Sequence, residues 1–117
     1  MGLSRLPMEM AQQSALHEAM NRLWAQYLPQ IEERVATLEA AGRSLMDGTL
    51  TAEQSERASA AAHNLAGVLG TFGLAEGTTL AREAEAFYCI GPPIEPTVNA
   101  RMVEVAVRLR ALIATRK

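Results

Sequence analysis

The sequence predicts an all-α protein built as an antiparallel up-down bundle of four helices. Aromatic residues are only 4% of the chain, while Ala, Leu, Glu and Arg are abundant, and this composition favours helix over sheet. Apolar residues recur at spacings of three, four and seven, as they do in amphipathic helices. The connections between the expected helices are short, which favours antiparallel neighbours. We expect either an N-terminal helical extension or a kinked first helix.

The first expected helix carries one apolar stripe, which runs from Met20 to Leu45. Pro29 falls within the stripe without shifting its phase. Because proline removes a backbone donor and crowds the preceding turn, we expect a kink there or a break into two consecutive helices. Gly48 ends the run, since glycine readily takes the left-handed conformation that follows many helices. His17 lies beside the stripe and is expected to be a half-buried structural residue.

A capping box predicts where the second helix begins. The Thr51 hydroxyl and the Gln54 side chain are spaced to satisfy exposed backbone amides reciprocally, so we expect a helix from about 52 to about 71. Glycines near the end of this helix weaken helical structure locally. We therefore place a short connection at 71–73 and a third helical stretch at 74–88.

The last helix follows a proline-rich segment, residues 89–96, through which no helix can continue. Pro96 suits the first turn of the final helix, where a backbone N–H has no intrahelical partner. The apolar stripe of that helix comprises Val98, Met102, Val105, Leu109 and Leu112. We expect one domain over residues 1–117, with the bundle at about 17–115 and an N-terminal extension at 1–16.

Charge and composition argue against several classes of function. The formal net charge is −2 and the arginines are scattered among acidic residues, so no basic stripe predicts a nucleic-acid partner. No apolar run approaches the roughly 20 residues that span a bilayer, and no membrane partner is expected. Cys89 is the single cysteine, which favours a reducing, cytoplasmic location. Neither histidine belongs to a Glu-x-x-His pair, so no metal site is predicted.

His63 is expected to face solvent from the middle of the second helix. At about 100° per residue, the leucine side of this helix lies nearly opposite His63. That core face comprises Ala58, Ala61, Leu65, Leu69 and Phe72. The face that His63 shares comprises Glu56, Ser59, Ala60, Gly67 and Gly70.

The glycines on the histidine's face call for a reason. Each mid-helix glycine costs about 0.5 to 1 kcal/mol relative to alanine. Gly67 and Gly70 lie one and two turns beyond His63, where they would clear the approach of a partner protein to the imidazole. The alternative is that the glycines let another helix pack closely, with His63 an ordinary surface or interhelical residue.

The residues around His63 resemble those of the histidine-containing phosphotransfer domain, whose pattern is His-x-Leu-Lys-Gly followed by small residues. The corresponding residues are His63, Asn64, Leu65, Ala66 and Gly67, with Gly70, Gly73, Leu80 and Glu85 beyond them. The resemblance implies a four-helix bundle in which His63 accepts a phosphoryl group from a receiver-domain aspartyl phosphate and passes it to another receiver. It implies a phosphorelay protein of two-component signalling without catalytic turnover of its own.

The same resemblance implies the partners and their cofactor. Response-regulator receiver domains are the expected partners, with a hybrid histidine kinase as a further one. Mg²⁺ is expected on the receiver, and no cofactor of the chain's own is expected. The predicted docking surface around His63 comprises Glu56, Ser59, Ala60, Asn64, Ala66, Gly67 and Gly70.

The motif departs from the family pattern at its basic residue. Ala66 stands where lysine is common, and Asn64 stands where some relatives carry lysine instead. Phosphoryl transfer depends on neutralising oxygen charge, so the missing cation should slow transfer or destabilise the phosphohistidine. Arg57 is a poor substitute by its angle on the helix, and Arg82 would serve only if packing turned it toward His63.

Two other functions therefore stay open at this stage. The chain could be a docking module of the same fold that binds receivers or kinases without taking phosphate, or a purely structural bundle.

A histidine side chain is largely neutral near pH 7, so one ring nitrogen is free to attack phosphorus. The nearest candidates to bond the other nitrogen are Asn64, Glu56 and Ser59. Glu83 and Glu85 are interpreted as a solvated helix face.

Overall fold

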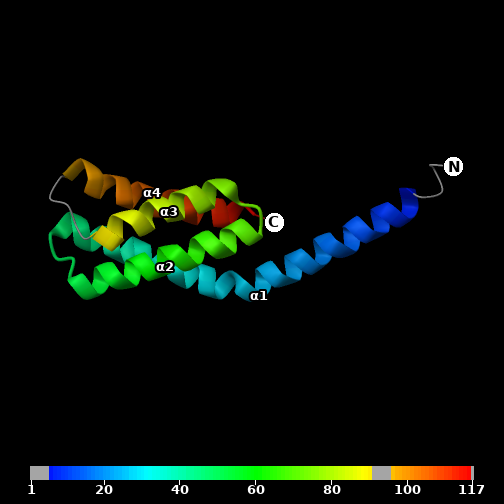
Figure 1. The fold of residues 1–117 in the computed structure, drawn as a ribbon, viewed down its shortest axis with the longest axis horizontal. Helices are drawn as coiled ribbons and strands as arrows, with labels where there is room; N and C mark the ends of the chain where they lie inside the picture. The colour runs from blue at the N-terminus through cyan, green and yellow to red at the C-terminus, as the bar shows by residue number, and fades with distance from the viewer. Residues whose placement is uncertain (1–5, 91–95, 117) are drawn as a thin grey trace.

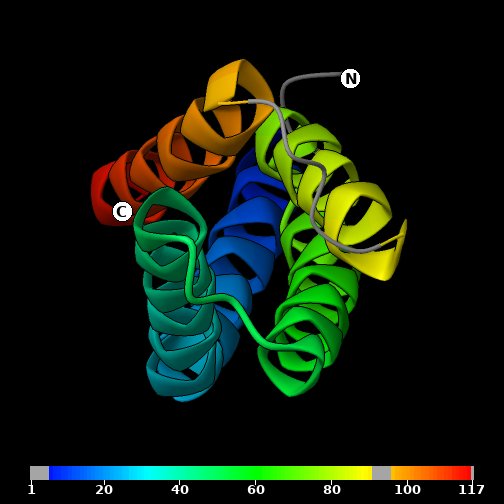
Figure 2. The ribbon, with the colours of Figure 1, turned by 90° about the vertical axis from the view of Figure 1, so that its left-hand side faces the viewer.

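The computed structural model describes residues 6–90 and 96–116, whose regular structure is entirely helical. Over these residues the chain forms α1 (Leu6–Asp47), α2 (Ala52–Thr71), α3 (Ala75–Ile90) and α4 (Pro96–Thr115). Each helix packs on the next, and α4 returns to pack on α1, so the four form a ring around one core (Figure 2). Their directions alternate along the bundle (Figure 1). The predicted all-α up-down four-helix bundle is confirmed.

α1 is a single helix of 42 residues that runs through Pro29. Of the two alternatives expected at Pro29, the break into two consecutive helices does not occur. Trp24 and Ile31, on either side of the proline, are both buried on the same stripe, and Pro29 itself is exposed. Core packing on both sides keeps the helix continuous where one backbone hydrogen bond is lost.

The first part of α1 projects beyond the other helices (Figure 1). All side chains from 9 to 18 are exposed, and the structure measures 65 × 23 × 20 Å. The N-terminal helical extension is therefore confirmed over residues 6–16. His17 is exposed, so its predicted half-burial is wrong: the apolar stripe continues past the point where neighbouring helices end.

The core is formed by apolar residues at helical spacing on all four helices. Trp24 packs edge-on against Phe72 with the ring centroids 5.1 Å apart, which joins α1 to the end of α2. Burying one large apolar side chain stabilises a fold by about 1.5 to 3 kcal/mol. The largest fully buried side chains are Ile31, Val35, Leu38, Leu65, Leu69, Val105 and Leu109.

The ends of α2 and α3 follow the local signals in the sequence. The backbone N–H of Gln54 donates to the Thr51 hydroxyl at 3.1 Å, and the backbone N–H of Thr51 donates to Oε1 of the Gln54 side chain at 2.9 Å. The predicted capping box and the 52–71 helix are confirmed. Gly48 and Gly73 adopt φ values of +70° and +73° at the ends of α1 and α2. α3 begins one residue later and ends two later than predicted.

Residues 91–95 of the proline-rich segment lie outside the described residues, so the predicted end of helical structure there is not tested. α4 begins at Pro96, as predicted. No helix over the described part of the chain is long and apolar enough to cross a membrane.

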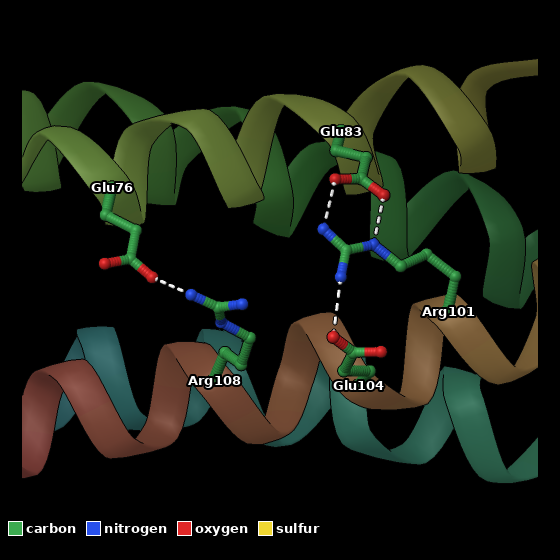
Figure 3. Close-up of polar contacts among 5 residues, drawn as sticks. All are labelled: Glu76, Glu83, Arg101, Glu104 and Arg108. Atoms are coloured by element: carbon green, nitrogen blue, oxygen red, sulfur yellow. Dashed lines mark hydrogen bonds and ion pairs between the residues drawn. The ribbon is translucent and has the colours of Figure 1, made fainter.

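Ion pairs fasten α3 to α4 (Figure 3). The Arg101 guanidinium donates to both carboxylate oxygens of Glu83, at 2.7 and 2.9 Å, and to Glu104 at 2.8 Å. Arg108 pairs with Glu76 one level further along. Glu83 is thus an ion-pair partner of α4, which the interpretation of Glu83 and Glu85 as a solvated helix face does not include. Such half-exposed pairs each contribute about 1 kcal/mol or less.

Candidate functional site

His63 lies in the middle of α2 and points away from the core. Its side chain is 72% exposed, whereas Leu65 and Leu69 on the opposite side are 0% and 1% exposed. The outward orientation predicted for His63 is confirmed. An imidazole in this position is open to a partner protein.

One nitrogen of the His63 ring is held by α3. Nδ1 lies 2.8 Å from Oε2 of Glu85, a carboxylate whose side chain is 32% exposed. An ionised carboxylate has no proton to donate, so in this pair the proton is on Nδ1 and the carboxylate accepts it. In the neutral ring Nε2 then carries a free lone pair. The contact therefore fixes both the orientation of the ring and the nitrogen that is available as a nucleophile.

The packing of α2 on α3 sets this distance. The Ser55 hydroxyl donates to the Tyr88 carbonyl at 2.7 Å, and the Ser59 hydroxyl donates to the Glu85 carbonyl at 3.4 Å. These bonds link α2 to the part of α3 that carries Glu85. Small buried residues also allow the two helices to approach closely: Ala58, Ala62, Ala66, Gly77, Ala81 and Ala84.

His63 and Asn64 lie between two hollows in the surface. The α1–α2 hollow has a volume of about 340 Å³, and the α2–α3 hollow has one of about 400 Å³. The α1–α2 hollow is lined by Tyr27, His63, Asn64, Gly67, Val68, Thr71 and Phe72. The α2–α3 hollow is lined by Glu56, Ser59, Ala60, His63, Asn64, Glu85, Tyr88 and Cys89.

Most of the residues predicted to form the docking surface line these hollows. They are Glu56, Ser59, Ala60, Asn64 and Gly67. A Cβ added at Gly67 would meet no atom within 4 Å, so the space beside His63 is open there. Gly70 is exposed but lies outside both hollows, and a Cβ there would touch Oγ1 of Thr78 at 3.4 Å.

The prediction that Ala66 belongs to the docking surface is wrong. Its side chain is 4% exposed and is part of the core. α3 packs on this side of α2, and the Thr78 hydroxyl lies 3.3 Å from the Ala66 carbonyl oxygen. Because three residues make nearly one helical turn, Ala66 lies close to His63 in angle around the helix axis. The neighbouring helix α3 nevertheless covers it.

No lysine or arginine lines either hollow among the described residues. Arg57 pairs loosely with Glu53, at 3.9 Å along the same helix. Arg82 is exposed and lines neither hollow. The described residues also hold no group of three or more His, Cys, Asp and Glu side chains that could bind a metal ion.

The residue pattern did not reveal two members of the site. Glu85 is the partner of His63, although it was interpreted as part of a solvated face; its place in the matching motif was the only signal for it. Tyr27 lines the α1–α2 hollow from α1, and nothing in the sequence near His63 points to it. The presence of Glu85 and Tyr27 in the site depends on which residues of α3 and α1 lie at the same height along the bundle as His63.

Residues 22–115 match the family model of the Hpt domain, and this range includes α2, α3, α4 and the packed part of α1. The chain belongs to the Hpt domain family. The chain is also 36% identical over 66 residues to Protein RcaC of Microchaete diplosiphon. That match covers 56% of this chain but only 10% of the relative, so the chain spans about a tenth of that protein's length. No solved structure gives a significant match.

Family membership indicates a phosphorelay role in two-component signalling. Hpt domains function there with response-regulator receivers and histidine kinases. The resemblance noted in the residues around His63 is therefore confirmed at the level of the family.

Proposed function

We propose that this Hpt domain is a phosphorelay intermediate whose phosphorylated residue is His63. It accepts a phosphoryl group from the aspartyl phosphate of one receiver domain and passes it to the aspartate of another. The observation that carries the proposal is the exposed imidazole with Nδ1 bonded to Glu85 at 2.8 Å. This arrangement leaves Nε2 free on a surface that a partner protein can reach.

The transfer step forms one bond and breaks one. The Nε2 lone pair forms an N–P bond while the bond between phosphorus and the receiver's carboxylate oxygen breaks, and the carboxylate leaves with the electron pair. The proton on Nδ1 stays in place, so the ring becomes a phosphorylated imidazolium beside the Glu85 carboxylate. The second transfer reverses these bonds toward a different aspartate. No general base in the chain is required.

The receiver supplies the cations in this proposal. The surface around His63 offers Glu56 and Glu85 but no basic side chain among the residues that line the two hollows. Charge on the transferring oxygens is neutralised by Mg²⁺ and a basic group of the receiver. The docking surface contributes access through Ser59, Ala60 and Gly67, whose small side chains leave the imidazole uncovered.

Phosphotransfer from isolated receivers tests the proposal. Incubation with a receiver carrying radioactive aspartyl phosphate should give the chain a label that is acid-labile and alkali-stable, as phosphohistidine is. His63→Gln should abolish the label. His17→Gln is the matched control, since His17 is the other histidine of the chain and is also exposed; it should label as the wild type does.

A second function is favoured by one observation: no basic side chain among the described residues lines the two hollows beside His63. In that case the domain docks on receivers or kinases without taking phosphate. Wild type that binds receivers but never takes label would establish this function and overturn transfer. If Gly67→Arg leaves all receiver binding unchanged, the surface is not a docking site, and a purely structural bundle is the remaining reading.

A further inference from the structure

We propose that the phosphoryl group on Nε2 of His63 is held in the α1–α2 hollow by two neutral donors, the Tyr27 phenol and the Asn64 carboxamide. The inference rests on the proposed function of His63. It assigns to this chain a phosphoryl-binding site that uses neutral hydrogen-bond donors where relatives use a basic side chain.

The direction of the imidazole is the first step. Its two nitrogens lie on different edges of the ring, and Nδ1 is bonded to Glu85 of α3. Nε2 therefore faces away from α3. His63 also lines the α1–α2 hollow, on the side of α2 away from α3, together with Tyr27 of α1. We therefore place a phosphoryl group on Nε2 at this hollow.

The charges of the two hollows give the second step. The α2–α3 hollow is lined by the carboxylates of Glu56 and Glu85, which would repel a phosphoryl dianion. The α1–α2 hollow is lined by no carboxylate and by no basic residue. Of the two spaces beside His63, only the α1–α2 hollow can accept the group without repulsion. Among the residues that line this hollow, any stabilisation comes from neutral donors; the Arg116 guanidinium lies outside the lining and stacks on Phe72, with its Cζ 5.2 Å from the ring centroid.

The lining of the α1–α2 hollow offers few such donors. The Thr71 hydroxyl already donates to the Gly67 carbonyl at 3.1 Å, so its oxygen can only accept. Val68, Phe72 and Gly67 have no polar side chain. Tyr27 and Asn64 remain, each with at least one side-chain N–H or O–H available. Tyr27 is 41% exposed as a residue, and its ring packs edge-on against Phe72 with the ring centroids 6.4 Å apart.

The lifetime of the phosphohistidine tests the site without any receiver. The full chain is phosphorylated with phosphoramidate, a small donor that phosphorylates imidazole directly, and hydrolysis is followed by phosphorus NMR. Tyr27→Phe and Asn64→Ala should each shorten the half-life about two- to tenfold, as expected for losing one hydrogen bond. Thr71→Val is the matched control in the same hollow, and its half-life should equal that of the wild type. Asn64→Lys should lengthen the half-life.

Unchanged half-lives in both Tyr27→Phe and Asn64→Ala would overturn the inference. If phosphoramidate gives no label, inorganic phosphate is titrated instead while NMR follows the Tyr27 ring and the Asn64 side-chain amide. Selective shifts of these two groups support the site, and their absence overturns it. Failure of the proposed function is a separate result, since receivers would then leave His63 unlabelled whatever the half-life of the chemically formed phosphohistidine.

Discussion

Nδ1 of His63 lies 2.8 Å from Oε2 of Glu85, although the two residues are 22 positions apart in the chain. The contact joins the exposed face of α2 to α3. It leaves Nε2 pointing away from the only carboxylate that bonds the ring within the described residues. In the proposed transfer, this interhelical hydrogen bond determines which atom of the histidine meets the partner.

Glu85→Ala should slow phosphotransfer from a receiver about tenfold. A hydrogen bond to a charged group contributes about 1.5 to 3 kcal/mol, and solvent screening at this exposed pair reduces it to about one factor of ten in rate. Single-turnover transfer measured at saturating receiver is the relevant assay. Glu83→Gln is the matched control on the same helix, because Glu83 pairs with Arg101 and not with His63. Equal rates for Glu85→Ala and Glu83→Gln would remove Glu85 from the mechanism.

The sequence predicted the helices well because their signals are local. The Thr51–Gln54 capping box, the glycines at 48 and 73 and the apolar stripes each depend on residues within one or two turns. Pro29 is the exception: its local effect predicted a possible break, but burial of Trp24 and Ile31 on either side outweighs it. The predicted half-burial of His17 is wrong for a different reason: no neighbouring helix reaches this part of α1 to cover the residue.

The site could be predicted only as far as α2 alone determines it. The outward direction of His63 and the open space at Gly67 follow from one helix and its angular spacing. Glu85, Tyr27 and the burial of Ala66 depend on the position and register of α3 and α1 relative to α2. Periodicity within a single helix carries no information on that register.

The two helical glycines Gly67 and Gly77 should respond differently to alanine. Gly67→Ala should raise the free energy of unfolding by about 0.5 to 1 kcal/mol, because a Cβ there meets nothing within 4 Å and helix propensity improves. Gly77→Ala should be less stable than Gly67→Ala by about 1 kcal/mol or more, since its Cβ would lie 2.9 Å from Cδ1 of buried Leu69. Urea unfolding of both variants measures the difference. Equal stabilities would mean that Leu69 moves without cost.

The projecting part of α1 should be dispensable for stability. Removal of residues 1–18 should change the free energy of unfolding by less than about 0.5 kcal/mol, because every side chain from 9 to 18 is exposed. Trp24 and Ile31, which anchor α1 in the core, remain. Urea unfolding of the shortened chain provides the measurement. A loss of several kcal/mol would show that the bundle depends on this extension.

Arg101→Ala should weaken the fold at neutral pH but not in strong acid. The hydrogen bond from Arg101, aided by its charge and opposed by burial, lowers the pKa of Glu83 below its ordinary value of 4.5. A carboxyl whose pKa is lower in the folded state stabilises the fold above about pH 4.5, and that contribution is lost as pH falls through the folded-state pKa.

The stability of Arg101→Ala should therefore be measurably lower than that of the wild type at pH 7, and the difference should shrink below pH 4. Arg57→Ala is a suitable comparison, because its pair with Glu53 is 3.9 Å long and largely exposed. It should have no measurable effect at either pH. A difference for Arg101→Ala that persists in acid would mean that the guanidinium stabilises by packing and not by charge.

Tyr88→Phe should be neutral or stabilising at pH 7 and clearly stabilising in alkali. The Tyr88 side chain is 3% exposed, and its hydroxyl has no hydrogen-bond partner within the described residues, so removing the hydroxyl removes a buried, unsatisfied group. Burial raises the pKa of Tyr88 from 10.0 to about 12. Between these values the unfolded chain releases the phenolic proton while the folded chain keeps it, so wild-type stability falls as pH rises from about 10 to about 12. The fall should be on the order of 2 kcal/mol, and Tyr88→Phe should lack it. The urea midpoints of wild type and Tyr88→Phe at pH 8, 10 and 11.5 measure this fall in stability, with Tyr27→Phe as the control for an exposed tyrosine. If wild type and Tyr88→Phe lose stability in parallel, another group causes the alkaline instability.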